Sequence, residues 1–200
     1  ILKPRATFSH KGTYGHCFVV AGSYGMIGAT VLCAKAAVNS GAGLVTVHIP
    51  KCGYDIVQQS APMAMCKVDA NENFITSISN IDKYSSICIG PGLGTNVQTK
   101  KALEMIISEV KVPLVLDADA LNIISENKDL LLTLPENTIL TPHPGEFDRL
   151  FGKSDSGSER LKKVIEAAKT YKLIIVLKGA YTQVVNSEGC VYFNSTGNAG

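Results

Sequence analysis

The most informative feature of the sequence is a histidine held between two prolines, in the stretch Thr141-Pro142-His143-Pro144-Gly145-Glu146. Each proline fixes its own φ and pushes the preceding residue out of the helical region, so we expect Thr141 and His143 to be extended. Glu146 then opens an amphipathic segment. A histidine presented so rigidly at the end of a strand is typical of a binding site. A stiff turn with a solvated histidine explains the local pattern equally well.

Two glycine-rich segments each follow a short apolar run and precede a helical pattern. Glycines let a ligand approach the backbone closely, and free amides at the start of a helix attract anions. The spacing in Gly22-x-x-Gly25-x-x-Gly28 is not that of the dinucleotide fingerprint, and a tight turn with close helix packing is slightly favoured there. In Gly90-Pro91-Gly92-Leu93-Gly94 the three glycines favour a binding loop, and Thr95 is the expected N-cap of the next helix.

Charged side chains follow two further apolar runs. Asp117 and Asp119 lie where a carboxylate can hold Mg²⁺ through its waters, orient a polar substrate or cap the helix that starts there. We expect one of the two to cap the helix and the other to face a cleft, without assigning which. Lys178 stands beside Gly179 where a strand turns into the last hairpin, which suits phosphate. An ordinary surface lysine is about equally consistent with the local pattern.

Several other kinds of catalytic site are not represented in the sequence. It contains no nucleophile elbow for a Ser/His/Asp triad, no zinc-type spacing of cysteines and histidines, and no Walker A motif. Any phosphate chemistry therefore does not use a P-loop.

The motifs are carried by alternating strand and helix patterns. Apolar runs predict strands at 17–21, 44–49, 87–89, 114–116 and 174–177, and a terminal antiparallel hairpin from 182–186 and 190–193. A buried helix is predicted over 29–39, and two amphipathic helices are predicted around Leu103, Ile106, Ile107 and Val110 and around Leu161, Val164, Ile165 and Ala168.

This alternation predicts an α/β fold with a largely parallel sheet and helices on both faces. In such folds the ligand binds at the carboxyl ends of the strands. All five motif loops leave strands in that direction, so we expect them to form one cleft.

Length and composition indicate an ordinary globular domain. The 200 residues are 46% hydrophobic and 18% charged, with a formal net charge of +2 and no basic run that would indicate nucleic-acid binding. No apolar stretch approaches the roughly 20 residues that span a bilayer, and no signal peptide is visible. Of six scattered cysteines, Cys17, Cys33 and Cys88 lie in apolar runs and are expected to be small buried hydrophobes in a reduced, cytoplasmic protein.

Taken in order, the motifs resemble one family across essentially the whole chain. The chain is similar to the ADP/ATP-dependent NAD(P)H-hydrate dehydratases, a carbohydrate-kinase-like domain often fused behind an epimerase domain. The markers are His10-Lys11-Gly12-x-Tyr14-Gly15, Gly22-Ser23 through Gly28-Ala29, Ser40-Gly41-Ala42-Gly43-Leu44-Val45, Gly90-Pro91-Gly92-Leu93-Gly94, Leu116-Asp117-Ala118-Asp119-Ala120-Leu121-Asn122, Thr141 through Phe147, and Lys178-Gly179. Each marker is weak alone, and their order and spacing together are specific.

The resemblance implies a ribokinase-like three-layer α/β/α fold and the repair of NADHX and NADPHX, the hydrated forms of the nicotinamide cofactors. The family transfers phosphate from ADP or ATP, with Mg²⁺ present, to the hydroxyl group on the hydrated ring. Phosphate then leaves with help from the ring nitrogen, and NAD(P)H is restored. This route is physically reasonable because phosphate with Mg²⁺ is a far better leaving group than hydroxide.

The resemblance also assigns residues by matching position. Ala29, Gly94 and His143 would contact the hydrate, and Glu146 and Asp119 would be polar residues of the cleft. The nucleotide's phosphate side would be lined by Lys178, Gly179, Ala180, Tyr181 and Thr182. No protein metal ligand is assigned, and the implied partners are the hydrate, the adenine nucleotide, further copies of the chain and an epimerase domain, fused or separate.

The family's catalytic aspartate lies in a Gly-x-Gly-Asp segment just after the position of Gly197-Asn198-Ala199-Gly200, where Ala199 is a mild departure. We therefore expect residues 1–200 to be a single domain truncated at both ends, with the aspartate beyond Gly200. One alternative is a kinase of the same fold that acts on a vitamin precursor. Another is a non-catalytic nucleotide-binding module, if the chain truly ends at Gly200. The Pro-His-Pro-Gly form of the His143 loop resembles the ADP-using branch.

Overall fold

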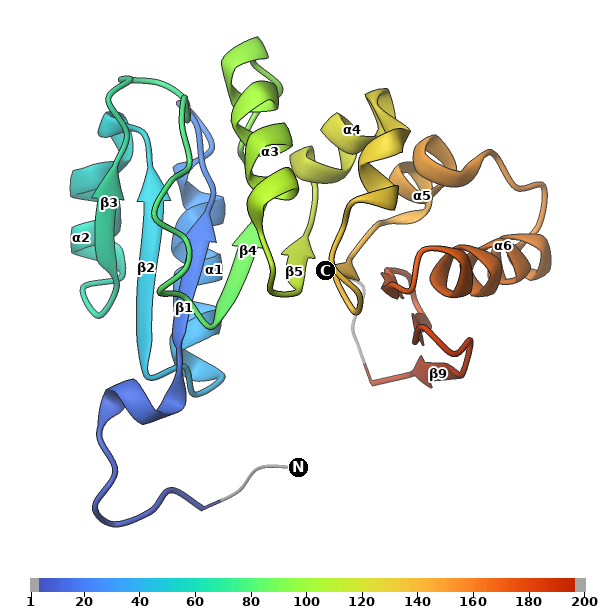
Figure 1. Cartoon of the computed structure of the whole chain (residues 1–200), viewed down its shortest axis with the longest axis horizontal. Helices are drawn as coiled ribbons and strands as arrows, with labels where there is room; N and C mark the ends of the chain where they lie inside the picture. The colour runs from blue at the N-terminus through green and yellow to red at the C-terminus, as the bar shows by residue number, and fades with distance from the viewer. Residues whose placement is uncertain (1–3, 197–200) are drawn as a thin grey trace.

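A computed structural model of the chain describes residues 4–196, in which helices and strands alternate as the sequence predicts (Figure 1). The segment Gly197–Gly200, where the family's glycine-rich stretch was expected, lies outside the described residues. The strands are β1 (His16–Val20), β2 (Leu44–Ile49), β3 (Met65–Val68), β4 (Ser86–Ile89), β5 (Leu114–Leu116), β6 (Ile139–Leu140), β7 (Ile174–Leu177), β8 (Thr182–Val185) and β9 (Val191–Asn194). The α-helices are α1 (Ile27–Asn39), α2 (Tyr54–Ser60), α3 (Val97–Glu109), α4 (Asp119–Glu126), α5 (Pro144–Phe151) and α6 (Gly157–Thr170), and short 3₁₀ helices span Lys11–Tyr14, Lys51–Gly53 and Lys128–Leu132.

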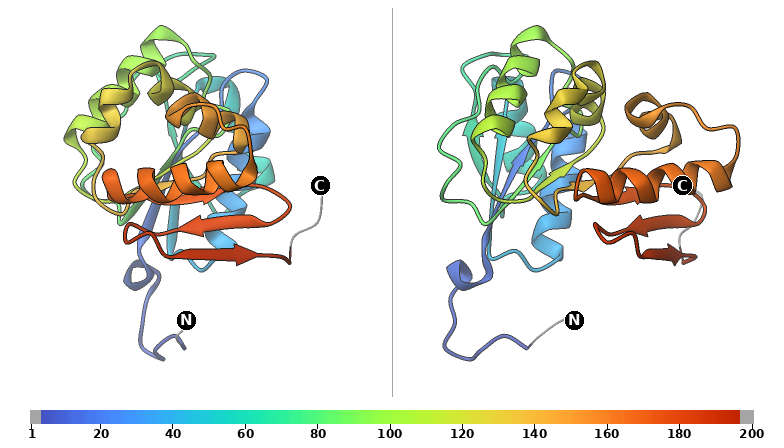
Figure 2. Two further views of the ribbon diagram at one scale, coloured as in Figure 1. Left: turned by 90° about the vertical axis from the view of Figure 1, so that its right-hand side faces the viewer. Right: turned by 45° about the vertical axis from the view of Figure 1, so that its right-hand side comes forward.

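The strands of residues 4–196 form one nine-stranded sheet in the order β3-β2-β1-β4-β5-β6-β7-β8-β9. Every pair from β3 to β7 is parallel, and β8 and β9 add in antiparallel fashion. Seen from the side of β9, the terminal hairpin lies along the edge of the sheet beneath α6 (Figure 2). The predicted mostly parallel sheet with a terminal antiparallel hairpin is confirmed.

Two apolar clusters lie on opposite faces of the sheet. The larger cluster joins strand residues such as Phe18, Ile87 and Leu116 to helices α3, α4, α5 and α6. The smaller cluster joins Val19, Val45 and Val47 to α1 and α2. Alternate residues of β1 and β2 therefore point to different faces, as the period of a strand requires. Helices lie on both faces of the sheet, which confirms the predicted layers.

On the face of the sheet that carries the smaller cluster, α1 and α2 leave one area uncovered. That cluster includes no residue of β5, β6 or β7. Apolar side chains on this face remain partly exposed, namely Val115, Ile139, Ile174, Val176 and Val184. Parallel sheets are normally covered on both faces. This area of the sheet is called the open face below.

Two local predictions need correction. The N-cap of α3 is Asn96, whose side chain accepts a hydrogen bond from the backbone N–H of Gln98 at 3.0 Å, and not Thr95. Cys17, Cys33 and Cys88 pack against the smaller cluster but are only partly buried. Strand β3 was not expected, because its side chains alternate poorly and two of its four residues are exposed at the sheet edge.

The described helices and side chains were also compared with the requirements of membrane spans and metal clusters. Within residues 4–196, none of the helices combines the length and the apolar character that crossing a membrane requires. The same residues hold no group of three or more His, Cys, Asp or Glu side chains arranged to bind a metal. All six cysteines are free thiols.

The long connection between β3 and β4 folds around one buried carboxylate. Asp69 accepts hydrogen bonds from the backbone N–H groups of Asn71, Thr76 and Ser77 and from the Thr76 hydroxyl, at 2.7 to 3.3 Å. His48 lies 3.5 Å away, and its two ring nitrogens face backbone carbonyl oxygens. Burial by itself raises the pKa of Asp69, but these hydrogen bonds outweigh it and lower the pKa below its ordinary value.

The connection organised by Asp69 reaches the first glycine-rich loop. The carbonyl oxygen of Asn73 accepts a hydrogen bond from the backbone N–H of Tyr24 at 2.7 Å. The carbonyl oxygen of Ile75 accepts one from the hydroxyl of Thr99 in α3 at 2.7 Å. A buried carboxylate at the sheet edge thus supports a loop at the ends of the strands.

We expect Asp69→Asn to lower the free energy of unfolding at pH 7 by about 1–3 kcal/mol, because an amide cannot accept all four hydrogen bonds. Since the folded pKa of Asp69 is depressed, its stabilisation is complete above the ordinary aspartate pKa of about 3.9 and is lost as the pH falls through the folded value. Urea denaturation at pH 7 and at lower pH should show the difference between wild type and variant shrinking below about pH 4.

The exposed Asp82 provides the control, because Asp82→Asn should change stability by no more than about 0.5 kcal/mol. A difference for Asp69→Asn that stays constant down to pH 2 would contradict the proposed ionised state.

Candidate active site at the carboxyl ends of the strands

Five loops follow five consecutive parallel strands and meet at one edge of the sheet. The strands are β1, β4, β5, β6 and β7, which are neighbours in the sheet order. The loops are Gly22–Gly28, Gly90–Gly94, Asp117–Asn122, Thr141–Glu146 and Lys178–Tyr181, and this set is called the rim below. Because the strands are parallel, all five loops leave from the same edge, as expected for a ligand site in an open α/β sheet.

Backbone contacts join the first two loops of the rim. The N–H of Gly22 donates to the carbonyl oxygen of Pro91 at 2.9 Å, and the Ser23 hydroxyl donates to the carbonyl oxygen of Gly92 at 2.9 Å. Gly92 has φ +63°, and a Cβ there would lie 2.8 Å from the Met26 carbonyl oxygen and 3.2 Å from the Ala29 Cβ. The glycine is needed because the start of α1 packs directly on this turn.

The second and third loops approach even more closely. Gly90 has φ +127°, and a Cβ at this position would overlap the carbonyl oxygen of Asp117 and lie 2.8 Å from the Ala120 Cβ. Ala118 has φ +49°, which is uncommon for a residue with a side chain and costs on the order of 1–3 kcal/mol. Its turn is closed by a hydrogen bond from the N–H of Ala120 to the carbonyl oxygen of Asp117 at 3.1 Å. Close packing and strain therefore coincide in this loop.

Asp117 and Lys178 connect the third loop to the fifth. The Lys178 Nζ donates to Asp117 Oδ1 at 2.7 Å, and both side chains are partly exposed. The backbone N–H of Lys178 donates to the Pro142 carbonyl oxygen at 2.8 Å, so the fourth loop lies between them. A partly exposed lysine held by a single carboxylate is a cation that can turn toward an anionic ligand.

His143 is extended, with φ −78° and ψ 167°, as predicted from the two prolines. It is the N-cap of α5, and its Nδ1 accepts hydrogen bonds from the backbone N–H groups of Gly145 and Glu146 at 3.0 and 3.3 Å. Because Nδ1 accepts, the proton of the neutral ring is on Nε2. The side chain is 50% exposed at the rim, and its Nε2 lies 3.4 Å from Glu146 Oε1.

Glu146 is buried below His143 and completes a capping box. Its Oε2 accepts a hydrogen bond from the backbone N–H of His143 at 2.8 Å, and its Oε1 lies 3.4 Å from His143 Nε2. The residue is only 5% exposed. The carboxylate therefore holds His143 from behind and is not turned toward solvent.

The two aspartates of the third loop have different partners. Asp119 Oδ2 accepts a hydrogen bond from the backbone N–H of Gly94 at 2.8 Å, and Oδ1 accepts one from the Asn122 side chain at 3.2 Å. Asp117 instead pairs with Lys178. Neither aspartate is the N-cap of α4, a position occupied by Ala118. The expectation that one of them caps this helix is wrong, because the strained turn at Ala118 opens the helix instead.

The structure brings most of the predicted residues to the rim. Ala29 lies in the first turn of α1 against Gly92, and Gly94 has φ +75° beside Ser23. In the fifth loop Gly179 and Ala180 are exposed, Tyr181 is 66% exposed, and the Thr182 hydroxyl donates to the Gly179 carbonyl oxygen at 3.1 Å. The residues predicted to line the nucleotide thus form an open loop, whereas Ala29 and Gly94 pack against neighbouring loops of the rim.

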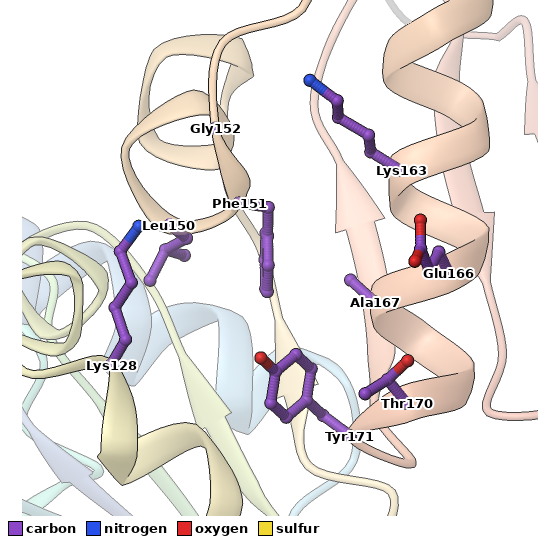
Figure 3. Close-up of a pocket in the computed structure, with 9 residues that line it drawn as sticks. All are labelled: Lys128, Leu150, Phe151, Gly152, Lys163, Glu166, Ala167, Thr170 and Tyr171. Atoms are coloured by element: carbon purple, nitrogen blue, oxygen red, sulfur yellow. The ribbon is translucent and has the colours of Figure 1, made fainter.

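A separate hollow of about 440 Å³ lies between α5 and α6 (Figure 3). Phe151 and Tyr171 point into it, with Lys128 and Lys163 at its margin. Gly152, which follows the C-terminal end of α5, lines it, whereas His143 lies at the N-terminal end of that helix. None of the predicted site residues lines it, so its chemistry is not that of the rim.

Two polar residues of the site were not expected from the sequence. Asn122 and Arg149 are linked by a hydrogen bond from Arg149 Nη2 to Asn122 Oδ1 at 2.9 Å. Asn122 occurs in the predicted third-loop motif but was given no role, and Arg149 looks like an ordinary cation near the end of an amphipathic helix. Only the contact between α4 and α5 singles them out.

Comparison with known proteins identifies the family. A sequence profile of the NAD(P)H-hydrate dehydratases matches residues 17–200. The chain belongs to the NAD(P)H-hydrate dehydratase family. The predicted resemblance is therefore confirmed.

Curated members of the NAD(P)H-hydrate dehydratase family align over the whole chain. The bifunctional NAD(P)H-hydrate repair enzyme Nnr of Coxiella burnetii is 37% identical over 207 residues, which cover 100% of this chain and 40% of that protein. The ADP-dependent (S)-NAD(P)H-hydrate dehydratase of Neisseria meningitidis is 37% identical over 208 residues, covering 100% of this chain and 68% of that protein. The chain thus spans about two fifths of the bifunctional relatives.

Solved structures agree with the ribokinase-like fold expected for this family. The Bacillus subtilis ADP/ATP-dependent NAD(P)H-hydrate dehydratase, co-crystallised with ATP and Mg²⁺, has a TM-score of 0.81 and 29% identity, covering 98% of this chain and 69% of that chain. A ribokinase-like superfamily protein of Enterococcus faecalis has a TM-score of 0.83 and 25% identity, covering 98% and 68%. A hydroxyethylthiazole kinase of Pyrococcus horikoshii, with a TM-score of 0.57 and 14% identity, shares the fold alone.

Proposed function

We propose that the protein containing this chain converts NADHX and NADPHX back to NADH and NADPH by phosphorylation with ADP or ATP, followed by loss of phosphate. It is then a hydro-lyase of metabolite repair. The observation that carries the proposal is the alignment of the whole chain, at 37% identity, with the N. meningitidis dehydratase named for this activity. The rim supports the proposal, because it presents the half-exposed His143 side chain in one loop and the partly exposed Lys178 in another.

On the substrate side, we propose that Ala29, Gly94 and His143 contact the hydrate. The Nε2–H of His143 can donate a hydrogen bond to an oxygen of the nicotinamide hydrate, such as its carboxamide oxygen. Because Nδ1 is engaged by two backbone N–H groups, His143 is suited to orientation and not to proton abstraction. Gly94 keeps the backbone close to the ring position, and Glu146 supports His143 from behind.

On the nucleotide side, we propose that the loop from Lys178 to Thr182 lines the phosphates of ADP or ATP. Lys178 can exchange its contact with Asp117 for a phosphate oxygen, since both groups are partly exposed. The Lys178 side chain would turn toward the negative charge that develops on the transferred phosphoryl group.

The described residues are compatible with Mg²⁺ only as a partner of the nucleotide. Residues 4–196 contain no group of three metal-binding side chains, and Mg²⁺ commonly uses one carboxylate together with phosphates and waters. Asp117 is the carboxylate at the nucleotide side that would serve. When bound, Mg²⁺ neutralises phosphate charge and makes phosphate a better leaving group.

The direct test is NADH absorbance in the full protein supplied with NADHX. We expect absorbance to recover only when ADP or ATP and Mg²⁺ are present together. The alternative function, a kinase that acts on a vitamin precursor, would instead release a stable phosphorylated alcohol that mass spectrometry detects. No recovery with either nucleotide would exclude the dehydratase.

His143→Ala should raise KM for the hydrate more than it lowers kcat, because a ground-state contact is removed. Loss of one hydrogen bond corresponds to roughly fivefold in KM. His143→Asn is the matched control, since asparagine is a good N-cap and keeps the start of α5 but does not reach as far. If His143→Asn restores the wild-type KM, then His143 acts only as a cap.

We also infer that these 200 residues are part of a larger domain whose remaining part covers the open face. The partly exposed Val115, Val176 and Val184 support this, as does the greater length of the relatives.

In the full protein, Val176→Lys should lower the free energy of unfolding by more than about 3 kcal/mol, because it would bury a charge. Val68→Lys on edge strand β3, where Val68 is 41% exposed, should cost less than about 1 kcal/mol. Equal small costs would mean that the open face is solvated.

Further proposals concern partners and compartment. We propose that the chain is one part of a bifunctional or partnered repair system with an epimerase domain, supported by the bifunctional names of several relatives. We also propose a homo-oligomer in the cytoplasm, where six free thiols remain reduced. Light scattering by the purified full protein would measure the oligomeric state, and fractionation would measure the compartment.

A further inference from the structure

A chain of hydrogen bonds runs from α5 through α4 to the backbone of Gly94. Arg149 Nη2 donates to Asn122 Oδ1 at 2.9 Å, and Asn122 Nδ2 donates to Asp119 Oδ1 at 3.2 Å. The other oxygen of Asp119 accepts from the Gly94 N–H at 2.8 Å. We call Arg149, Asn122 and Asp119 the relay.

The chemistry of the end groups fixes the direction of the relay. A guanidinium only donates hydrogen bonds and a carboxylate only accepts them, so the amide of Asn122 can satisfy both only in the orientation observed. Both oxygens of Asp119 are engaged by protein donors. Asp119 is thereby suited to orienting the Gly94 loop.

The relay also includes a residue of α5, the helix that begins in the fourth loop of the rim. The other guanidinium nitrogen, Arg149 Nη1, lies near Gly145, where a Cβ would approach it to 3.9 Å. Gly145 is one of the two residues whose N–H groups bind His143 Nδ1. Because Arg149 belongs to α5, the relay links the Gly94 turn to the helix whose start presents His143.

We propose that Arg149 and Asn122 are positioning residues, which act through Asp119 to set the spacing between the Gly94 backbone and His143. This proposal rests on the proposed function, because these two elements are the proposed contacts of the hydrate. Asn122 and Asp119 are partly buried, which strengthens the hydrogen bond between them relative to a fully solvated pair, whereas Arg149 is exposed. Without Arg149, the Asn122 amide is free to turn, and Asp119 loses its second donor.

In the full protein, Arg149→Ala should raise KM for NADHX roughly fivefold with kcat within about twofold, because it disturbs ground-state alignment. Arg149→Lys should recover most of the loss, because an ammonium can also donate to Asn122 Oδ1. Asn122→Ala should match Arg149→Ala, and the double variant should be no worse than either single variant, since both remove one chain.

Arg160→Ala is the matched control for charge and for the attachment of α5. Arg160 binds Asp148 of the same helix through Nε and Nη2, both at 3.1 Å, from the side of α6. It has no contact with the relay, so KM should stay at the wild-type value. An equal rise in KM would mean that any loosening of α5 has the same effect, and would overturn the proposal.

Two further outcomes would overturn the relay. An unchanged KM in Arg149→Ala would remove its role, and a rise confined to NADPHX would mean that Arg149 binds the extra phosphate directly.

Amide hydrogen exchange at Gly94, followed by NMR, tests the relay without catalysis. We expect exchange about tenfold faster in Arg149→Ala and unchanged in Arg160→Ala. If wild type shows no turnover, the proposed function fails while this exchange measurement still decides the relay.

Discussion

The close approach of Gly90 to the carbonyl oxygen of Asp117 is the contact on which the arrangement of the rim depends. Parallel strands bring loops to a common edge, but strand spacing alone leaves room between them. Here a residue with a Cβ would push the second and third loops apart. That contact lets the Gly94 turn reach Asp119 and leaves Asp117 turned toward Lys178. The remaining contacts of the rim follow from this spacing.

The two aspartates show how neighbouring carboxylates acquire different roles from their surroundings. Asp119 receives a backbone N–H and a side-chain amide, and its charge is used to hold the protein in place. Asp117 accepts one hydrogen bond, from the ammonium group of the partly exposed Lys178, so a ligand can replace this partner. A strained residue, Ala118, lies between them and turns the chain so that the two side chains point to different loops. Strain of this kind persists where surrounding contacts over-determine it.

The sequence was sufficient for the alternation of strands and helices, because apolar periodicity reflects burial directly. Strands β2, β5 and β7 agree residue for residue with the predicted runs. Edge strand β3 could not be predicted, since little of it is buried. His143 and the glycines were identifiable because proline and glycine have restricted or unusual backbone conformations.

The partners of polar side chains were not predictable in the same way. Asn122 and Arg149 meet across α4 and α5, and nothing in their local patterns indicates a lateral hydrogen bond. The bond from the His143 N–H to Glu146 is local, but histidine is not one of the residues that usually cap a helix. The positive φ of Ala118 was equally invisible, because alanine normally avoids that conformation. Packing between segments far apart in the sequence decides the Arg149–Asn122 contact and the Ala118 conformation, and local sequence patterns do not reveal such packing.

The capping box at the start of α5 gives His143 two duties in one ring. Nδ1 closes the helix start and Nε2 is the donor proposed for the hydrate, while Glu146 holds the backbone of the same residue. A substitution there changes folding and recognition at once, so the two traits cannot drift independently. An evolutionary path to a different ligand at this rim therefore has to begin elsewhere, or to replace the ring and the cap together.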